Sequence, residues 1–149
     1  MIRALAIGTA LALLPLAASA QSTFERFEAV AVAMNGMMNE AFIAEIPALE
    51  GNLPDPEWDE PMREAYTCMY DGYVERVGEE PVAEMVTQME VMLETMDPAE
   101  LLDGGAAVEN PDGISDEEAL EIVEGCNLMA VFMARMAESG AMQIMMQQQ

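Results

Sequence analysis

Two cysteines, Cys68 and Cys126, are the residues of this sequence whose chemistry is most clearly defined. In an oxidising compartment, two cysteines in one chain are expected to form a disulfide with each other. That bond would join two predicted helices and close about 59 residues, which stabilises the fold by ~4 kcal/mol in the chain-entropy model. A redox-active pair is disfavoured, because such pairs are usually close in sequence and have a basic neighbour. We predict a structural disulfide.

Methionine is unusually abundant, with 16 in the chain. Thioether sulfur is a soft ligand suited to Cu(I), and two groups have suggestive spacing: Met34, Met37 and Met38, and Met142, Met145 and Met146. Other methionines instead recur at helical spacing on one face: Met85, Met89, Met92 and Met96, and Met129, Met133 and Met136. We predict that these are core residues, where methionine fills irregular gaps. A methionine-lined groove for a helical or lipidic partner and a copper site remain alternatives.

The acidic segment 110–118 resembles a calcium-binding EF-hand loop, with acid or amide residues leading to a glycine. The register fails, because taking Gly113 as loop position 6 places Val108 at position 1 and Ala119 at position 12. A turn at Asp112 and Gly113, followed by a helix cap at Ser115, explains the same residues without metal. We predict no metal ligands here.

Residue types needed for much enzyme chemistry are missing. The sequence has no histidine and no lysine, which removes the commonest general base, the commonest metal ligand and Schiff-base chemistry. Carboxylates are plentiful, but nothing singles out two of them as a catalytic pair. We therefore predict no catalytic residue and no cofactor, and expect that the protein is not an enzyme.

The charge balance is strongly acidic, with 28 Asp and Glu against five Lys and Arg, for a net charge of −23. Such a surface repels nucleic acid and anionic lipid, and it attracts cationic partners or metal ions. A simpler explanation is a solvated acidic surface that salt makes tolerable. Many of the acids also stand at predicted helix starts, where they favour the helix macrodipole.

Residues 1–20 have the pattern of a secretory signal peptide. Arg3 supplies a positive charge, an apolar run follows, and Ala18-Ser19-Ala20 matches an A-x-A cleavage pattern. The run is too short and too rich in alanine for a permanent membrane span. We expect a soluble periplasmic protein that begins at Gln21, with no membrane anchor after cleavage. Removing residues 1–20 takes away one arginine and no acid, so the charge becomes −24.

The rest of the sequence predicts helices separated by proline-marked turns. A capping box at Ser22 and Glu25 begins the first helix, and Gly78 ends the second, which starts near Asp59. Trp58 is expected to dock the loop 47–58 on the core. The apolar faces of the first, second and third predicted helices are, in that order, Phe24, Phe27, Ala31, Met34, Met38 and Phe42; Met62, Tyr66, Met69, Tyr73 and Val77; and Val82, Met85, Val86, Met89, Met92, Leu93 and Met96.

The C-terminal part predicts a short helix after Asp97, closed by Gly104 and Gly105, and then one long helix. The long helix begins with a capping box at Ser115 and Glu118 and ends at Gly140. We predict one helix rather than two, because its apolar spacing passes through Gly125 without a phase break. Its face is Ala119, Ile122, Val123, Cys126, Met129, Ala130, Met133 and Ala137. The predicted fold is an all-α bundle of about four main helices plus one short helix.

These observations divide the chain into a signal peptide (1–20), a helical domain (21–140) and an apolar, glutamine-rich tail (141–149). The tail is expected to be dispensable for folding and to fold back on the bundle or contact a partner. The predicted function is that of a non-enzymatic exported protein that binds a protein partner. The alternative is a metal-handling protein that uses methionine for Cu(I) or carboxylates for divalent cations.

Overall fold

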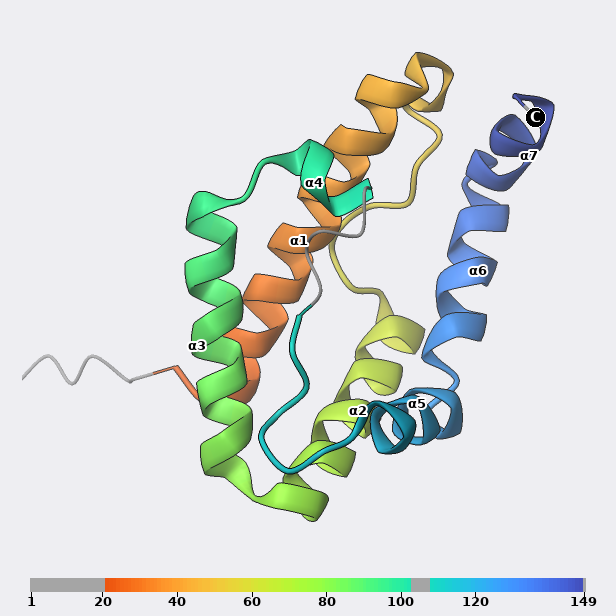
Figure 1. Cartoon of the computed structure of the whole chain (residues 1–149). Helices are drawn as coiled ribbons and strands as arrows, with labels where there is room; N and C mark the ends of the chain where they lie inside the picture. The colour runs from red at the N-terminus through yellow and green to blue at the C-terminus, as the bar shows by residue number, and fades with distance from the viewer. Residues whose placement is uncertain (1–20, 103–107, 149) are drawn as a thin grey trace, which may run out of the picture.

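A computed structural model describes residues 21–102 and 108–148, and within these ranges the chain is all-helical, with no strand (Figure 1). The described elements are α1 (Thr23–Glu45), the 3₁₀ helix η1 (Pro47–Leu49), α2 (Glu60–Val77), α3 (Glu79–Thr95), α4 (Pro98–Leu102), α5 (Asp116–Gly125), α6 (Leu128–Glu138) and α7 (Ala141–Gln147). The predicted signal peptide and Gly104-Gly105 lie outside the described residues. None of the described helices is long and apolar enough to cross a membrane.

The predicted helix boundaries at the capping residues are confirmed. The Ser22 hydroxyl accepts from the Glu25 backbone N–H at 3.2 Å, and the Glu25 carboxylate accepts from the Ser22 N–H at 2.7 Å. Ser115 and Glu118 make the same reciprocal pair at the start of α5. Gly78 separates α2 from α3 with a φ of 87°, a conformation that glycine adopts without steric cost.

The main core lies among α1, α2 and α3, where the predicted apolar faces meet. Its most deeply buried side chains include Phe27, Met62, Val82 and Val86. Trp58 is also buried, and its ring stacks on Tyr66 with the centroids 4.2 Å apart. The loop that precedes α2 is therefore docked on the core by Trp58, as the sequence predicts.

The predicted single helix from Ser115 to Gly140 is wrong. The chain breaks at Cys126 and Asn127, and Asn127 adopts a left-handed conformation with φ 55°. This turn changes the direction and the phase of the helix, so residues after the break do not continue the apolar face of α5. The predicted count of about four main helices plus one short helix is accordingly too low, because α5, α6 and α7 are separate helices.

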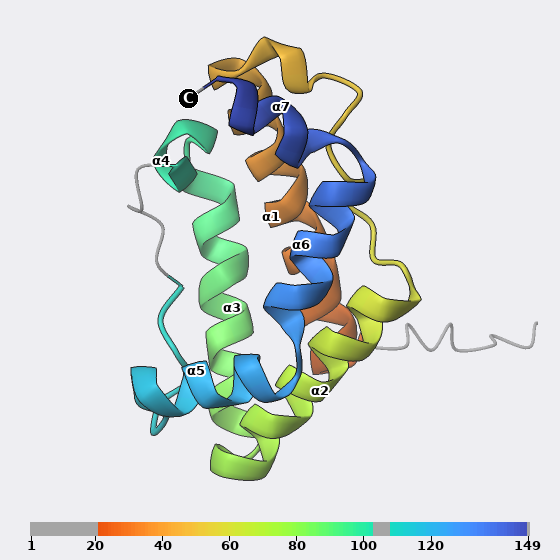
Figure 2. The ribbon, with the colours of Figure 1, turned by 90° about the vertical axis from the view of Figure 1, so that its right-hand side faces the viewer.

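After the break, α6 and α7 form an arm that runs beside α1 (Figures 1 and 2). The arm packs on α2 through α6 and on η1 through α7. At its far end, Ala141 is fully buried in a small second cluster with Leu49 and Met136. The arm is thus attached at both ends, and the loop between η1 and α2 passes between it and α1.

Candidate functional site

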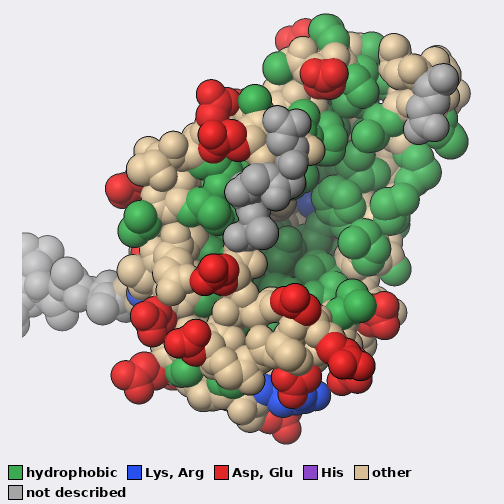
Figure 3. Space-filling model, viewed as in Figure 1, with side chains coloured by type: hydrophobic (Ala, Val, Ile, Leu, Met, Phe, Trp, Pro, Cys, Tyr) green, Lys and Arg blue, Asp and Glu red, His purple; other side chains and the backbone are tan. Residues whose placement is uncertain are grey.

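A hollow of about 270 Å³ opens among the three core helices. Figure 3 shows it as a recess floored by hydrophobic side chains. Five methionines line it: Met34 and Met38 from α1, Met69 from α2, and Met85 and Met89 from α3. We call this the methionine hollow. The sequence places each methionine on an apolar helix face, and the fold brings three of these faces to one cavity.

The five methionines differ in how deeply they are buried. Met69, Met85 and Met89 are buried, which confirms their prediction as core residues. Met34 and Met38 are half-buried, and they stand four residues apart on one face of α1. The methionines that α2 and α3 contribute to the hollow are therefore buried more deeply than those from α1.

Aromatic side chains complete the apolar lining: Phe27, Tyr66 and Tyr73. Burial raises the pKa of Tyr66 above its ordinary value of 10.0, an effect that nearby Arg135 partly offsets. Burial also raises the pKa of Tyr73. Both phenols therefore stay uncharged at neutral pH, so the interior of the hollow carries no charge from them.

Polar groups gather at one edge of the methionine hollow. Glu109 and Asn110 line it there, and both also line a neighbouring depression together with Glu84 and Asp112. Met85 is shared by the two. We call the three carboxylates of Glu84, Glu109 and Asp112 the acidic rim. All three residues are exposed.

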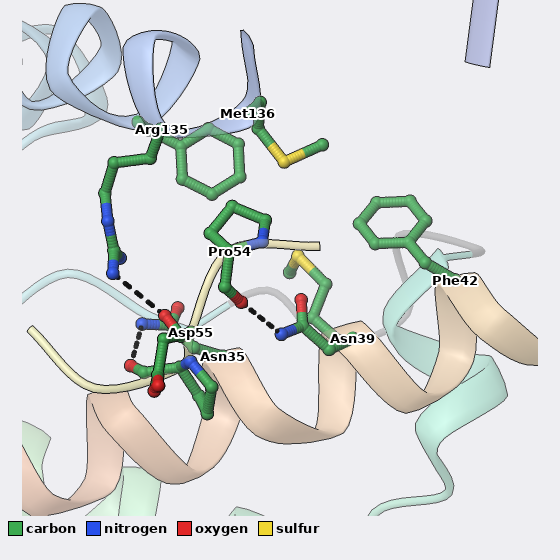
Figure 4. Close-up of a pocket in the computed structure, with 10 residues that line it drawn as sticks. Asn35, Asn39, Phe42, Pro54, Asp55, Arg135 and Met136 are labelled. Atoms are coloured by element: carbon green, nitrogen blue, oxygen red, sulfur yellow. Dashed lines mark hydrogen bonds between the residues drawn. The ribbon is translucent and has the colours of Figure 1, made fainter. Parts of the chain in front are cut away.

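A small polar joint holds the loop before α2 between α1 and α6 (Figure 4). Asn39 and Asn35 donate side-chain N–H bonds to the carbonyls of Pro54 and Pro56, at 2.9 and 3.3 Å. From α6, Arg135 Nη2 donates to the carbonyls of Asp55 and Glu57 at 2.9 and 2.8 Å. The space at this joint is about 20 Å³, little more than one water occupies, so it fixes the arm and is too small for a ligand.

Sequence reasoning missed the role of these joint residues. The Arg135 side chain is 12% exposed and also pairs with Asp59 at 3.0 Å. The one signal in the sequence was the isolation of Arg135, the only cation after Arg76. Asn35 and Asn39 also carried a signal, because an amide pair four residues apart on a helix marks a common polar stripe.

The arm exposes methionines that the sequence places in the core. Met129 is 62% exposed and Met133 is 45% exposed, so their prediction as core residues is wrong. The cause is the break at Asn127, after which α6 turns Leu128 and Phe132 inward. Met136 is buried, so its prediction as a core residue is confirmed. Figure 3 shows hydrophobic side chains along the arm that continue toward the hollow.

The predicted disulfide between Cys68 and Cys126 is present, with the two Cα atoms 5.7 Å apart. It joins α2 to the turn between α5 and α6, close to the base of the arm. The predicted turn before α5 is also confirmed. Gly113 has a φ of 94°, and the Ser115 side chain caps α5.

Within residues 21–102 and 108–148, no three or more histidine, cysteine, aspartate or glutamate side chains come together in a way that could hold a metal ion. A comparison of the chain with protein-family models, curated proteins and solved structures finds no match.

Proposed function

We propose that this protein is an exported, periplasmic, non-enzymatic binding protein, and that the methionine hollow is where it binds. The observation that carries the proposal is an open cavity of about 270 Å³ in a small helical domain. Protein interiors are close-packed, and voids larger than a water molecule are few. An apolar recess of this size therefore gives a ligand apolar surface to cover.

The composition of the hollow suits an adaptable apolar site. Binding pockets are mostly apolar, with a few polar groups that fix the orientation of the ligand. This hollow has an apolar lining of methionines and the polar residues Glu109 and Asn110. Methionine side chains are unbranched and polarisable, so they can repack around partners of different shape. Its volume fits one or two bulky apolar side chains rather than a large cofactor.

A metal-handling function is the second candidate, and the presence of five methionine side chains in the lining of one cavity favours it. Thioether sulfur selects Cu(I) over divalent cations. The carboxylate form of this candidate has no comparable support among the described residues.

The test of both candidates is titration of the purified protein with an uncharged apolar dye, 1-N-phenylnaphthylamine, and separately with Cu(I) held by a competing chelator. We expect the dye to bind and Met34→Gln to weaken it, because the substitution places an amide in the hollow. Met37→Gln is the matched control, since Met37 is also half-buried on α1 but does not line the hollow.

Met34→Leu separates the two candidates, because leucine keeps the apolar volume and removes the sulfur. An apolar site keeps its affinity for the dye in this variant, whereas a copper site loses affinity for Cu(I). Equal dye binding by the Met34→Gln and Met37→Gln variants contradicts the proposed site.

A further inference from the structure

The hollow adjoins a concentration of negative charge that no residue of the described chain neutralises. Each of Arg26, Arg63, Arg76 and Arg135 pairs with carboxylates elsewhere in the structure. Within the described part of the chain, no ion pair involves the acidic rim. The three rim carboxylates therefore have no arginine partner among the described residues.

An apolar cavity beside free carboxylates is complementary to a molecule that is apolar and cationic at once. The two features are contiguous, because Met85, Glu109 and Asn110 belong to both. On an amphipathic helix, side chains three or four positions apart are about 5–6 Å from each other, so one turn presents an apolar anchor and a basic residue side by side. This spacing matches a hollow that shares residues with its rim.

We propose that the methionine hollow and the acidic rim dock a cationic amphipathic helix of another polypeptide. Its apolar side chains enter among the methionines, and its lysine or arginine side chains face Glu84, Glu109 and Asp112. The inference rests on the proposed binding function and names the partner's chemistry. A second copy of this chain does not fit, because two such strongly acidic molecules repel each other.

The exposed arm extends the surface that such a helix covers. Met38 lines both the hollow and the joint, where Phe132 of α6 also lies. Beyond Phe132, the exposed Met129 and Met133 present further apolar surface. A helix anchored in the hollow thus has apolar contacts along α6, and the basic side chains remain at the rim.

The experiment measures binding of three fluorescent peptides by anisotropy. Each peptide has about five helical turns (~18 residues) and the same leucine face, and the polar face carries lysine, glutamine or glutamate. We expect the lysine peptide to bind tightest, to displace the uncharged dye, and to weaken as ionic strength rises. The glutamate peptide should not bind.

Two triple variants test whether the preference for the lysine peptide arises at the acidic rim. Glu84→Gln, Glu109→Gln and Asp112→Asn together should weaken binding of the lysine peptide by about tenfold. The matched control removes three exposed carboxylates that line neither the hollow nor the depression: Glu50, Glu64 and Glu138, each changed to glutamine. It carries the same net charge and should bind the peptide nearly as the wild type does.

Two results overturn the inference. One is equal affinity for the lysine and glutamine peptides, and the other is equal loss of affinity in both triple variants, which reflects net charge alone. If the dye still depends on Met34 in either case, the binding function stands and only the cationic partner is wrong. Sedimentation that shows self-association through the hollow also refutes the partner assignment.

Discussion

Arg135→Met should loosen the arm from the rest of the molecule. The side chain is 12% exposed, donates to two loop carbonyls at 2.8 and 2.9 Å and pairs with Asp59 at 3.0 Å. Hydrogen bonds from charged donors contribute about 1.5–3 kcal/mol each, and contributions within one network are not additive. Because the freed carbonyls lie in a surface loop that water can reach, we expect a loss of about 2–4 kcal/mol in the free energy of unfolding.

The assay is urea denaturation followed by the fluorescence of Trp58, the single tryptophan, which lies at the end of the same loop. Arg76→Met is the control, because Arg76 is about half exposed and its carboxylate partners are exposed too. Exposed ion pairs contribute little, so this variant should unfold close to the wild type. If the two variants lose equal stability, the argument that Arg135 holds the arm is refuted.

Three further perturbations test the account. Met89→Ala should lower the free energy of unfolding by about 2–5 kcal/mol, because the side chain is 6% exposed. Met133→Ala on the exposed arm should change it by less than about 0.5 kcal/mol. Chemical denaturation compares the two variants, and equal losses contradict the described break in the helix. Deleting residues 141–149 should lower the melting temperature, because Ala141 is buried against Leu49 and Met136, although the sequence alone predicts little change; an unaltered melting curve supports the sequence-based expectation. The hydrogen bond from Arg26 lowers the pKa of Glu90 below its ordinary value of 4.5. The contribution of this pair to the stability of the fold is therefore present above that pH and is lost as the pH falls below it. Glu90→Gln should therefore flatten the acid side of the stability profile, and an unchanged acid side contradicts the pairing.

The helical class, the capping boxes and the disulfide followed from local signals in the sequence. Ser22 with Glu25 and Ser115 with Glu118 are three residues apart, and that spacing satisfies the free N–H groups of a helix start in any tertiary context. The pairing of Cys68 with Cys126 could be predicted because the sequence has only these two cysteines. These features depend on composition and on short spacings between residues, and both can be read directly from the sequence.

The break at Asn127 and the open hollow depend on longer-range geometry. Apolar periodicity continues through Gly125 and Cys126, so it hides a left-handed residue that asparagine tolerates and that the disulfide-linked turn accommodates. Periodicity also shows which face of each helix is apolar, but not whether the facing side chains fill the space between three helices. At the hollow, Met34 and Met38 stay half-buried, whereas Met85 and Met89 are buried, and a cavity of about 270 Å³ remains among them.

Binding in the methionine hollow can be observed by a methyl NMR titration of protein labelled with ¹³C at the methionine methyl groups. As the uncharged dye is added, we expect chemical-shift changes for the methionines that line the hollow, assigned with single Met→Leu variants: Met34, Met38, Met69, Met85 and Met89. The exposed Met146, at the end of the arm, should keep its position. Shifts confined to the arm, at Met129, Met133 and Met146, would contradict a binding site in the hollow.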